Sequence, residues 1–226
     1  MEVMCVLSSV VFLVLIQLVV CKNETINCQV NTFQTKQNFN LKQYLGTWYE
    51  MKWLVPFDVP VADRYLDYRH NYTMNTDNQV LVSITARNSS KHCLYFNAYL
   101  NLTATPGKMV LSLQPDGGGD TYTYWVIDTD YVNYALTYAC GEMLPNGTCG
   151  KVRSWIWSRK TSISQTLLNS TEVLLNGLCV DASSLITTSH VEDACSKQND
   201  DAVITTSSCW CLIIPIVVYL SIFHLI

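Results

Sequence analysis

The feature that most constrains this chain is a succession of short runs of aromatic and β-branched residues between Leu45 and Lys160. Such side chains favour strands, and turn residues separate each run from the next, as in PFDVP, NTDN, TPGK and PDGGGD. Eight runs joined by short turns predict an all-β fold, an antiparallel sandwich or barrel, rather than alternating strands and helices. The runs are WYEMKWL, RYLDYRHNYTM, QVLVSITAR, CLYFNAYLNLTA, KMVLSLQ, TYTYWVID, NYALTYAC and VRSWIWSR.

One helix is expected after the last run, in SISQTLLNSTEVLLNG. Ser162 or Ser164 can cap its N-terminus, and Gly177 can end it. Its leucines recur at helical spacing and would pack on the outside of a barrel. This stripe consists of Leu167, Leu168, Leu174 and Leu175.

The chain begins with the apolar run VLSSVVFLVLIQLVV, and the polar cluster KNET follows at once. This pattern predicts a secretory signal peptide over residues 1–21. Residues 22–200, about 180 in number, are enough for one domain with a full core. The net charge of −4 argues against a nucleic-acid partner.

The last residues, CWCLIIPIVVYLSIFHLI, form a second apolar run, and no Lys, Arg, Asp or Glu follows Asp201. A spanning helix normally leaves Lys or Arg on its cytoplasmic side. Here a small-residue site at Asn199 or Asp200, a short polar spacer and the apolar tail follow one another, as in a glycosylphosphatidylinositol signal. We therefore predict that residues 201–226 are removed and that a lipid anchors the protein to the outer face of the plasma membrane. A single-pass anchor and a secreted form are the alternatives.

Cysteines and glycosylation acceptors are both typical of a secreted protein. An even number of cysteines without C-x-x-C or spaced Cys/His patterns predicts three disulfides and no metal site. The six cysteines outside the two terminal segments are Cys28, Cys93, Cys140, Cys149, Cys179 and Cys195. Asn-x-Ser/Thr acceptors, which require exposed asparagines if they are used, occur at Asn23, Asn71, Asn88, Asn101, Asn146 and Asn169.

The acceptors also indicate which side chains face inward, because successive residues of a strand point to opposite faces. If Asn71 and Asn101 face solvent, their alternating neighbours face the core, and both inward sets are mainly apolar. The residues expected to face inward are Leu66, Tyr68, His70, Tyr72 and Met74 in the second run; Val80, Val82, Ile84 and Ala86 in the third; and Leu94, Phe96, Ala98, Leu100 and Leu102 in the fourth.

Three segments resemble the lipocalin family, and within it the group of apolipoprotein D and the lipid-anchored, Lazarillo-like insect lipocalins. They are Gly46-Thr47-Trp48-Tyr49-Glu50, Thr129-Asp130-Tyr131 with the following Asn133-Tyr134-Ala135-Leu136, and Arg159 after Trp155-Ile156-Trp157. The resemblance implies an eight-stranded antiparallel up-and-down barrel with one C-terminal α-helix packed outside. It also implies that Trp48 plugs the closed base, that Arg159 covers its ring, and that Gly46 admits the entering chain.

The resemblance extends to part of the cysteine pattern. It implies a Cys28–Cys140 disulfide and matches Cys195, whose usual partner position is occupied here by Asp67. Four cysteines admit three pairings. We expect Cys93–Cys149 and Cys179–Cys195, with Cys93–Cys195 as the pairing that would contradict this choice.

An eight-stranded barrel has room for one small ligand, although the same side chains could instead fill the interior. Flat rings and tyrosine hydroxyls suit a fatty acid, a retinoid, a sterol or a bilin. We select as ligand-binding candidates Trp155, Trp157, Tyr124, Tyr134, Tyr138, Phe96, Tyr68 and His70, of which Tyr124 and Trp155 rest on the resemblance.

No catalytic site is expected. The G-x-S-x-G motif is absent, and the facing argument turns Cys93 outward, against an isomerase with a thiol inside the barrel. His70 is expected to be a hydrogen-bonded lining residue rather than a haem ligand, so no cofactor is predicted.

The sequence thus predicts a lipid-anchored extracellular protein that binds a small hydrophobic ligand. The alternative is a cell-surface recognition or axon-guidance molecule that uses the barrel as a scaffold and binds a surface protein. The segment Trp53–Val61 after the first run is unusually apolar for a loop. It is expected either to contact a membrane or partner or to fold over the ligand as a lid.

Overall fold

The computed structural model describes residues 26–76, 79–112, 121–191 and 195. The predicted signal peptide, the acceptor Asn23, the anchor residues Asn199 and Asp200 and the apolar tail lie outside the described residues. Eight strands form the predicted antiparallel barrel: β1 (Gly46–Leu54), β2 (Leu66–Met74), β3 (Val80–Arg87), β4 (Cys93–Leu102), β5 (Lys108–Ser112), β6 (Thr121–Thr129), β7 (Tyr134–Cys140) and β8 (Val152–Ser158).

The strands pair in chain order from β2 to β8, β8 pairs with β1, and β1 pairs with β2. The last pairing, between residues 46–49 of β1 and 69–72 of β2, closes the barrel. We call the end where β1 begins the base and the end where β1 stops the mouth. A short ninth strand, β9 (Ile186–Thr187), which was not predicted, pairs with the mouth half of β1.

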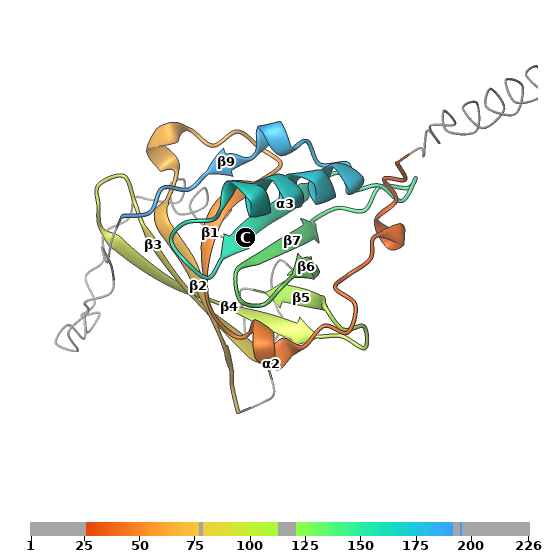
Figure 1. Cartoon of the computed structure of the whole chain (residues 1–226), viewed down its shortest axis with the longest axis horizontal. Coiled ribbons are helices and arrows are strands. Elements are labelled where there is room, and N and C mark those ends of the chain that lie inside the picture. The colour runs from red at the N-terminus through yellow and green to blue at the C-terminus, as the bar shows by residue number, and fades with distance from the viewer. Residues whose placement is uncertain (1–25, 77–78, 113–120, 192–194, 196–226) are drawn as a thin grey trace, which may run out of the picture.

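Short helices and one long helix lie outside the sheet (Figure 1). They are η1 (Val30–Thr32), α2 (Leu41–Tyr44) at the base, η2 (Val61–Asp63), α3 (Gln165–Gly177) and η3 (Ala182–Ser184). The predicted Ser164 cap is confirmed, since its side chain accepts a hydrogen bond from the Leu167 amide. Helix α3 buries Thr171 and Leu175 against the barrel, but Leu174, part of the predicted stripe, is exposed. Within the described residues, no helix is both long and apolar enough to span a bilayer.

The facing predicted from the glycosylation acceptors is confirmed in the middle of the strands. Tyr68, His70 and Tyr72 are buried on β2 while Asn71 is exposed, and the whole predicted inward set of β3 is buried. The prediction is wrong at the base ends of β2 and β4, where Met74 and Leu102 are exposed. Both residues lie where strands leave the barrel, so the alternation no longer has a core to face.

The base is closed around the ring of Trp48, which is fully buried. The Arg159 guanidinium lies 3.7 Å from the centre of this ring, and the Trp48 indole donates a hydrogen bond to the Tyr44 carbonyl. The same guanidinium donates hydrogen bonds of 2.9 to 3.2 Å to the main-chain carbonyls of Gln43, Tyr44, Thr47 and Tyr131. One cation therefore joins α2, β1 and the β6–β7 turn.

Gly46 permits this closure. Its φ of +95° lies in the region that favours glycine, and a Cβ atom there would approach Arg159 Nη1 to 3.3 Å. The Thr129-Asp130-Tyr131 segment supplies another part. Asp130 Oδ1 accepts hydrogen bonds from the amides of Val132, Asn133 and Tyr134, which fixes the turn that directs the Tyr131 carbonyl at Arg159.

All six described cysteines are disulfide-bonded, but none of the three expected pairs occurs. Cys140 and Cys149, nine residues apart, close the β7–β8 hairpin, where Met143 bridges Cys149. This leaves Cys28 to join Cys179, just beyond α3, and Cys93 to join Cys195. Pairing by resemblance failed because local hairpin geometry, which the spacing did not reveal, brings Cys140 and Cys149 together.

The segment after β9 contacts the mouth ends of β2, β3 and β4. Asp67, with a positive φ of 52° at an irregularity in β2, accepts a hydrogen bond from the Val191 amide. It also forms a buried ion pair with Arg87 at 2.7 Å. The resemblance led us to expect a cysteine at position 67, as the partner of Cys195. Asp67 occupies this position instead, and its carboxylate binds the segment after β9 through polar contacts.

A second carboxylate, Glu50 of β1, is almost fully buried and accepts a 2.5 Å hydrogen bond from Thr188 Oγ1. Its main-chain carbonyl lies 2.6 Å from His190 Nε2. Burial raises the pKa of Glu50 to about 8, although the Thr188 hydrogen bond acts in the opposite direction. The protonated carboxyl is therefore the form that the folded protein favours near neutral pH.

Replacement of Trp48 tests whether this side chain closes the base of the barrel. We expect Trp48→Ala to lower the free energy of unfolding by about 3 to 5 kcal/mol, because a fully buried indole and the cation–π contact are lost together. Urea unfolding measures the change, with Tyr95→Ala, at an exposed ring, as the control. Equal stabilities for the two variants would show that the base does not depend on Trp48.

Replacement of Glu50 by glutamine, which cannot ionise, tests whether the buried carboxyl is protonated in the folded protein. Its pKa in the folded protein, about 8, exceeds its ordinary value of 4.5, so unfolding between these values releases a proton. Stability should fall as pH rises through this range, by at most about 1.4 kcal/mol per pH unit. The difference in unfolding free energy between Glu50→Gln and the parent protein should grow over the same range. The exposed Glu142→Gln variant is the control, and a pH-independent difference for Glu50→Gln would contradict the assignment.

Candidate functional site

The interior above the base contains a cluster of rings, here called the interior cluster, from α2, β2, β6 and β8. The rings of His70 and Trp157 lie 4.6 Å apart, and those of Tyr124 and Trp155 lie 6.2 Å apart. Each ring is nearly or fully buried, so the lower part of the barrel is packed. The members are Tyr44, Tyr68, His70, Tyr72, Tyr124, Trp155 and Trp157.

Hydrogen bonds join the polar atoms of this cluster in a chain across the barrel. His70 Nε2 lies 3.1 Å from Tyr68 Oη, and His70 Nδ1 lies 2.9 Å from Tyr72 Oη. Tyr72 Oη continues to Tyr124 Oη at 2.8 Å, which lies 3.3 Å from Tyr44 Oη. The predicted hydrogen-bonded role of His70 is therefore confirmed.

The chain is electrically neutral. Burial lowers the pKa of His70 to about 3, and burial raises the pKa of each of the four tyrosines. A neutral imidazole of low basicity is a poor general base, and neutral hydroxyls suit a hydroxyl or carbonyl group better than an ion. Chemically, this arrangement can orient a polar atom of a ligand.

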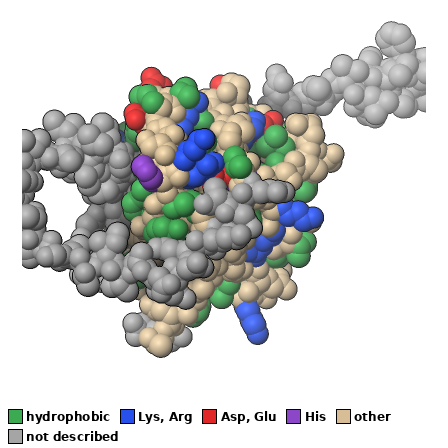
Figure 2. Space-filling view, turned by 90° about the vertical axis from the view of Figure 1, so that its left-hand side faces the viewer, with side chains coloured by type: hydrophobic (Ala, Val, Ile, Leu, Met, Phe, Trp, Pro, Cys, Tyr) green, Lys and Arg blue, Asp and Glu red, His purple; other side chains and the backbone are tan. Residues whose placement is uncertain are grey.

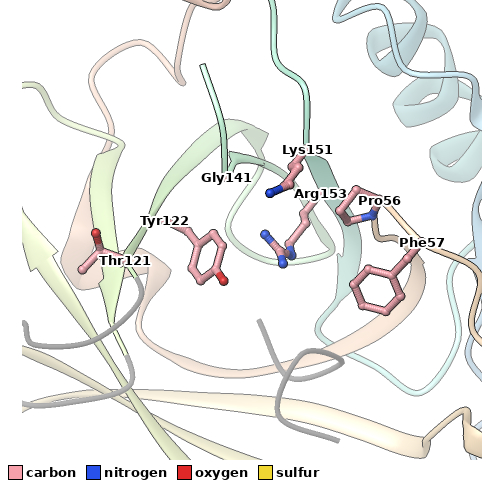
Figure 3. Close-up of a pocket in the computed structure, with 7 residues that line it drawn as sticks. All are labelled: Pro56, Phe57, Thr121, Tyr122, Gly141, Lys151 and Arg153. Carbon is pink, nitrogen blue, oxygen red and sulfur yellow. The ribbon is translucent and has the colours of Figure 1, made fainter. Parts of the chain in front are cut away.

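A cavity of about 400 Å³ lies at the mouth (Figure 3). We call it the mouth cavity. Figure 3 shows the side chains of Lys151 and Arg153 extending into the space between Tyr122 on one side and Pro56 with Phe57 on the other. The described residues that line it are Pro56, Phe57, Thr121, Tyr122, Gly141, Lys151 and Arg153.

The structure brings most of the candidate ligand-binding residues together but not all of them. Trp155, Trp157, Tyr124, Tyr68 and His70 lie in the interior cluster, and Phe96 packs against the same core from β4. Contact of these residues with a ligand stays a prediction.

Tyr134 and Tyr138 do not face the interior, and this part of the prediction is wrong. Tyr138 packs on the outer face against Phe33 and Trp125, and Tyr134 Oη donates a hydrogen bond to Asp128. Alternation explains the error: Ala135 and Ala139 fill the inward positions of β7, so the odd-numbered residues face the core and the even-numbered ones face outward.

The predicted apolar segment Trp53–Val61 supplies Pro56 and Phe57 to the mouth cavity. The sequence reasoning missed the rest of the described lining and the hydroxyl of Tyr44. Arg153 shares the strand parity of Trp155 and Trp157, so extension of that alternation by one step would have found it. Tyr44 precedes β1 and enters the barrel from α2, so no strand periodicity marks it.

Two other predictions concern chemistry outside this cluster. Cys93, considered as a nucleophile, is bonded to Cys195. Among the described residues there is no group of three His, Cys, Asp or Glu side chains that could hold a metal ion.

Of the described glycosylation acceptors, Asn71, Asn146 and Asn169 are exposed and the remaining two are partly buried, and their glycosylation stays a prediction.

Comparison with known proteins agrees with this geometry. Residues 45–192 match the model of the lipocalin / cytosolic fatty-acid binding protein family. Purpurin of Gallus gallus is 34% identical over 145 residues, which are 58% of this chain and 70% of purpurin. Retinol-binding protein 4 of Gallus gallus is 31% identical over 143 residues, 59% of this chain and 70% of that protein.

Solved structures agree on the fold. Insecticyanin from the tobacco hornworm Manduca sexta has a TM-score of 0.58 at 20% identity, over 72% of this chain and 87% of insecticyanin. Apocrustacyanin C1 has a TM-score of 0.56 at 20% identity, over 70% of this chain and 83% of that chain. With a family match over most of the described residues and relatives above 30% identity, the chain belongs to the lipocalin / cytosolic fatty-acid binding protein family.

Proposed function

We propose that this protein is an extracellular carrier that binds one small hydrophobic ligand, which enters through the mouth of the barrel. The observation that carries the proposal is the mouth cavity, whose volume of about 400 Å³ lies in the range of small-molecule sites. Apolar and aromatic side chains of Pro56, Phe57 and Tyr122 line it, and Tyr122 is followed on the inward face of β6 by Tyr124 of the interior cluster.

The ligand classes follow from this lining and from the relatives. Rings and apolar side chains favour a fatty acid, a retinoid, a sterol or a bilin, and one relative is named for retinol. The interior cluster fills the lower barrel, so a ligand would occupy the upper half and rest on Trp155 and Tyr124.

We place the protein in the group of apolipoprotein D and the Lazarillo-like lipocalins, glycosylated and attached by a lipid to the outer face of the plasma membrane. The disulfide from Cys93 to Cys195 supports a particular orientation, because Cys93 begins β4 at the mouth end. An anchor at Asp200, five residues after Cys195, would lie within about 18 Å of that cysteine. The mouth would then lie close to the lipid surface from which an apolar ligand can come.

A second function, surface recognition during cell or axon guidance, is favoured by the dense packing of the interior cluster. A barrel filled in this way can serve as a rigid scaffold for loops that contact a surface protein. The apolar mouth loop, in which Phe57 and Val61 are exposed, would then be the contact.

Tryptophan fluorescence separates the two functions. We expect saturable quenching of the domain ending at residue 201 by retinoic acid, arachidonic acid or biliverdin, because a ligand above the interior cluster lies beside Trp155. A Trp155→Phe, Trp157→Phe variant should lose most of this quenching, whereas Trp125→Phe, which alters a ring on the outer face, should retain it. Absence of quenching by all three compounds would reject the carrier and favour the scaffold.

Enzymatic release tests the anchor. On cells that express the full chain, phosphatidylinositol-specific phospholipase C should free the protein into the medium, because it cuts the predicted anchor between its glycerol and its phosphate. A chain ending at residue 201 is the control and should reach the medium without the enzyme. Full-length protein that stays on the cells after treatment would contradict the lipid anchor.

A further inference from the structure

In the mouth half of the barrel, β1 and β2 do not pair with each other. The two strands are paired over residues 46–49 and 69–72, which lie in the base half. Nearer the mouth, β8 continues along one side of β1, while residues 52–53 pair on the other side with β9. The chain then runs from β9 toward the left of Figure 1. A segment that follows α3 therefore fills the mouth half of this seam.

Hydrogen bonds attach this segment, residues 188–191, to both strands, and we call it the strap. The Thr188 amide donates a hydrogen bond of 3.0 Å to the Met51 carbonyl of β1. From the other side, the Asp67 amide of β2 donates one of 2.9 Å to the Ser189 carbonyl. The strap thus connects the two strands where they do not connect to each other.

The strap is held on both sides. Before it, β9 pairs with β1, and after it Cys195 is disulfide-bonded to Cys93 at the start of β4. Movement away from the wall is therefore confined to the few residues between these two attachments, and the strands of the barrel can stay paired while the strap moves.

A buried carboxyl lies under the strap. Glu50 of β1 is only 4% exposed, and its Oε1 atom accepts a hydrogen bond of 2.5 Å from Thr188 Oγ1. The main-chain carbonyl of Glu50 lies 2.6 Å from His190 Nε2. Figure 2 shows the side of the molecule toward which the chain runs after β9, where a His side chain lies at the surface near Lys and Arg side chains. Outward movement of the strap would therefore expose the carboxyl to water.

The titratable groups that face Glu50 come from β2 and from the strap, since the residue that pairs with it on β8 is a tryptophan. Burial, and then the charge of Glu50, raises the pKa of Tyr68 well above its ordinary value. Burial also lowers the pKa of His190 below its ordinary value of 6.5, with Arg69 acting in the same direction and Asp67 in the opposite one. Above pH 6.5, Tyr68 and His190 therefore stay neutral under the strap.

We infer that the strap is a proton-controlled closure of the barrel wall, which covers the seam while Glu50 is protonated and moves away from β1 as Glu50 releases its proton to water. An ionised carboxylate is costly in a buried site and is well solvated once the strap has moved. An open strap widens the mouth along the seam between β1 and β2. The inference goes beyond the proposed function, because it sets when the interior is accessible whatever the ligand is.

The direction of the pH effect follows from the two states of the carboxyl. Its pKa is about 8 under the strap and has its ordinary value of 4.5 in water, so opening releases a proton between these values. The open fraction should rise with pH over this range, by up to about tenfold per pH unit. Below pH 6.5, protonation of His190 in the open form acts against this trend, so the range from 6.5 to 8 isolates Glu50.

Hydrogen exchange of the protein purified from expressing cells measures the opening of the strap. The protection factors of the Thr188 and Val191 amides should fall between pH 6.5 and 8, by up to about tenfold per pH unit, because their hydrogen bonds break when the strap opens. Amides of the β7–β8 ladder report unfolding of the barrel and should stay better protected than the strap at every pH.

Three variants assign the effect. Glu50→Gln cannot ionise, so the protection factors of its strap should not change between pH 6.5 and 8, whereas the exposed Glu142→Gln should behave as the parent protein does. Thr188→Val keeps the carboxyl but removes the hydrogen bond that opposes the effect of burial on its pKa. In this variant the fall in protection should continue above pH 8.

Two results on the strap amides would overturn the inference: protection that is independent of pH in the parent protein, or pH dependence that survives Glu50→Gln. Protection equal to that of the β7–β8 ladder would also overturn it, since the strap would then open only when the barrel unfolds. No ligand is present in these measurements, so each of these results would leave the carrier function intact.

Discussion

The contact between Arg159 and Trp48 is the constraint on which the rest of this barrel depends. A barrel of eight strands has two ends, and an open base would expose the interior to water from both sides. The guanidinium closes the base by stacking on the indole and by donating hydrogen bonds to four main-chain carbonyls. Those carbonyls belong to segments far apart in the sequence, so one side chain fixes where α2 and the β6–β7 turn lie.

Closure at the base makes the two ends of the molecule chemically different. Immediately above the plug, buried hydroxyls and one neutral imidazole satisfy one another in a chain that leaves no charge in the lower barrel. The cationic side chains Lys151 and Arg153 line the cavity at the opposite end. Among the described residues, the two ends of the barrel therefore differ: neutral hydrogen-bonded rings lie above the closed base, and cationic side chains lie at the mouth.

The same sequence patterns that revealed the fold left parts of the site undetermined. Alternation counted from the acceptors Asn71 and Asn101 oriented the middle of β2, β3 and β4 correctly, but it failed at Met74 and Leu102. Strand β7 carries no acceptor, and β6 shifts its register between Val126 and Asp128, so the facing of Tyr134 and Tyr138 had no reference point. Disulfide pairing depends on how loops meet in space, and the compact β7–β8 hairpin could not be read from spacing alone. In contrast, the trio of Gly46, Trp48 and Arg159 was identified through its resemblance to the lipocalins, and its contacts at the base are confirmed.

The most direct test of ligand binding from the mouth is a crystal structure of the disulfide-bonded domain with a fatty acid that carries bromine on its terminal carbon. Anomalous scattering locates the bromine independently of the rest of the ligand. We expect the bromine inside the barrel, near Trp155. A bromine bound only on the outer surface, or a barrel without ligand at saturating fatty acid, would contradict binding through the mouth.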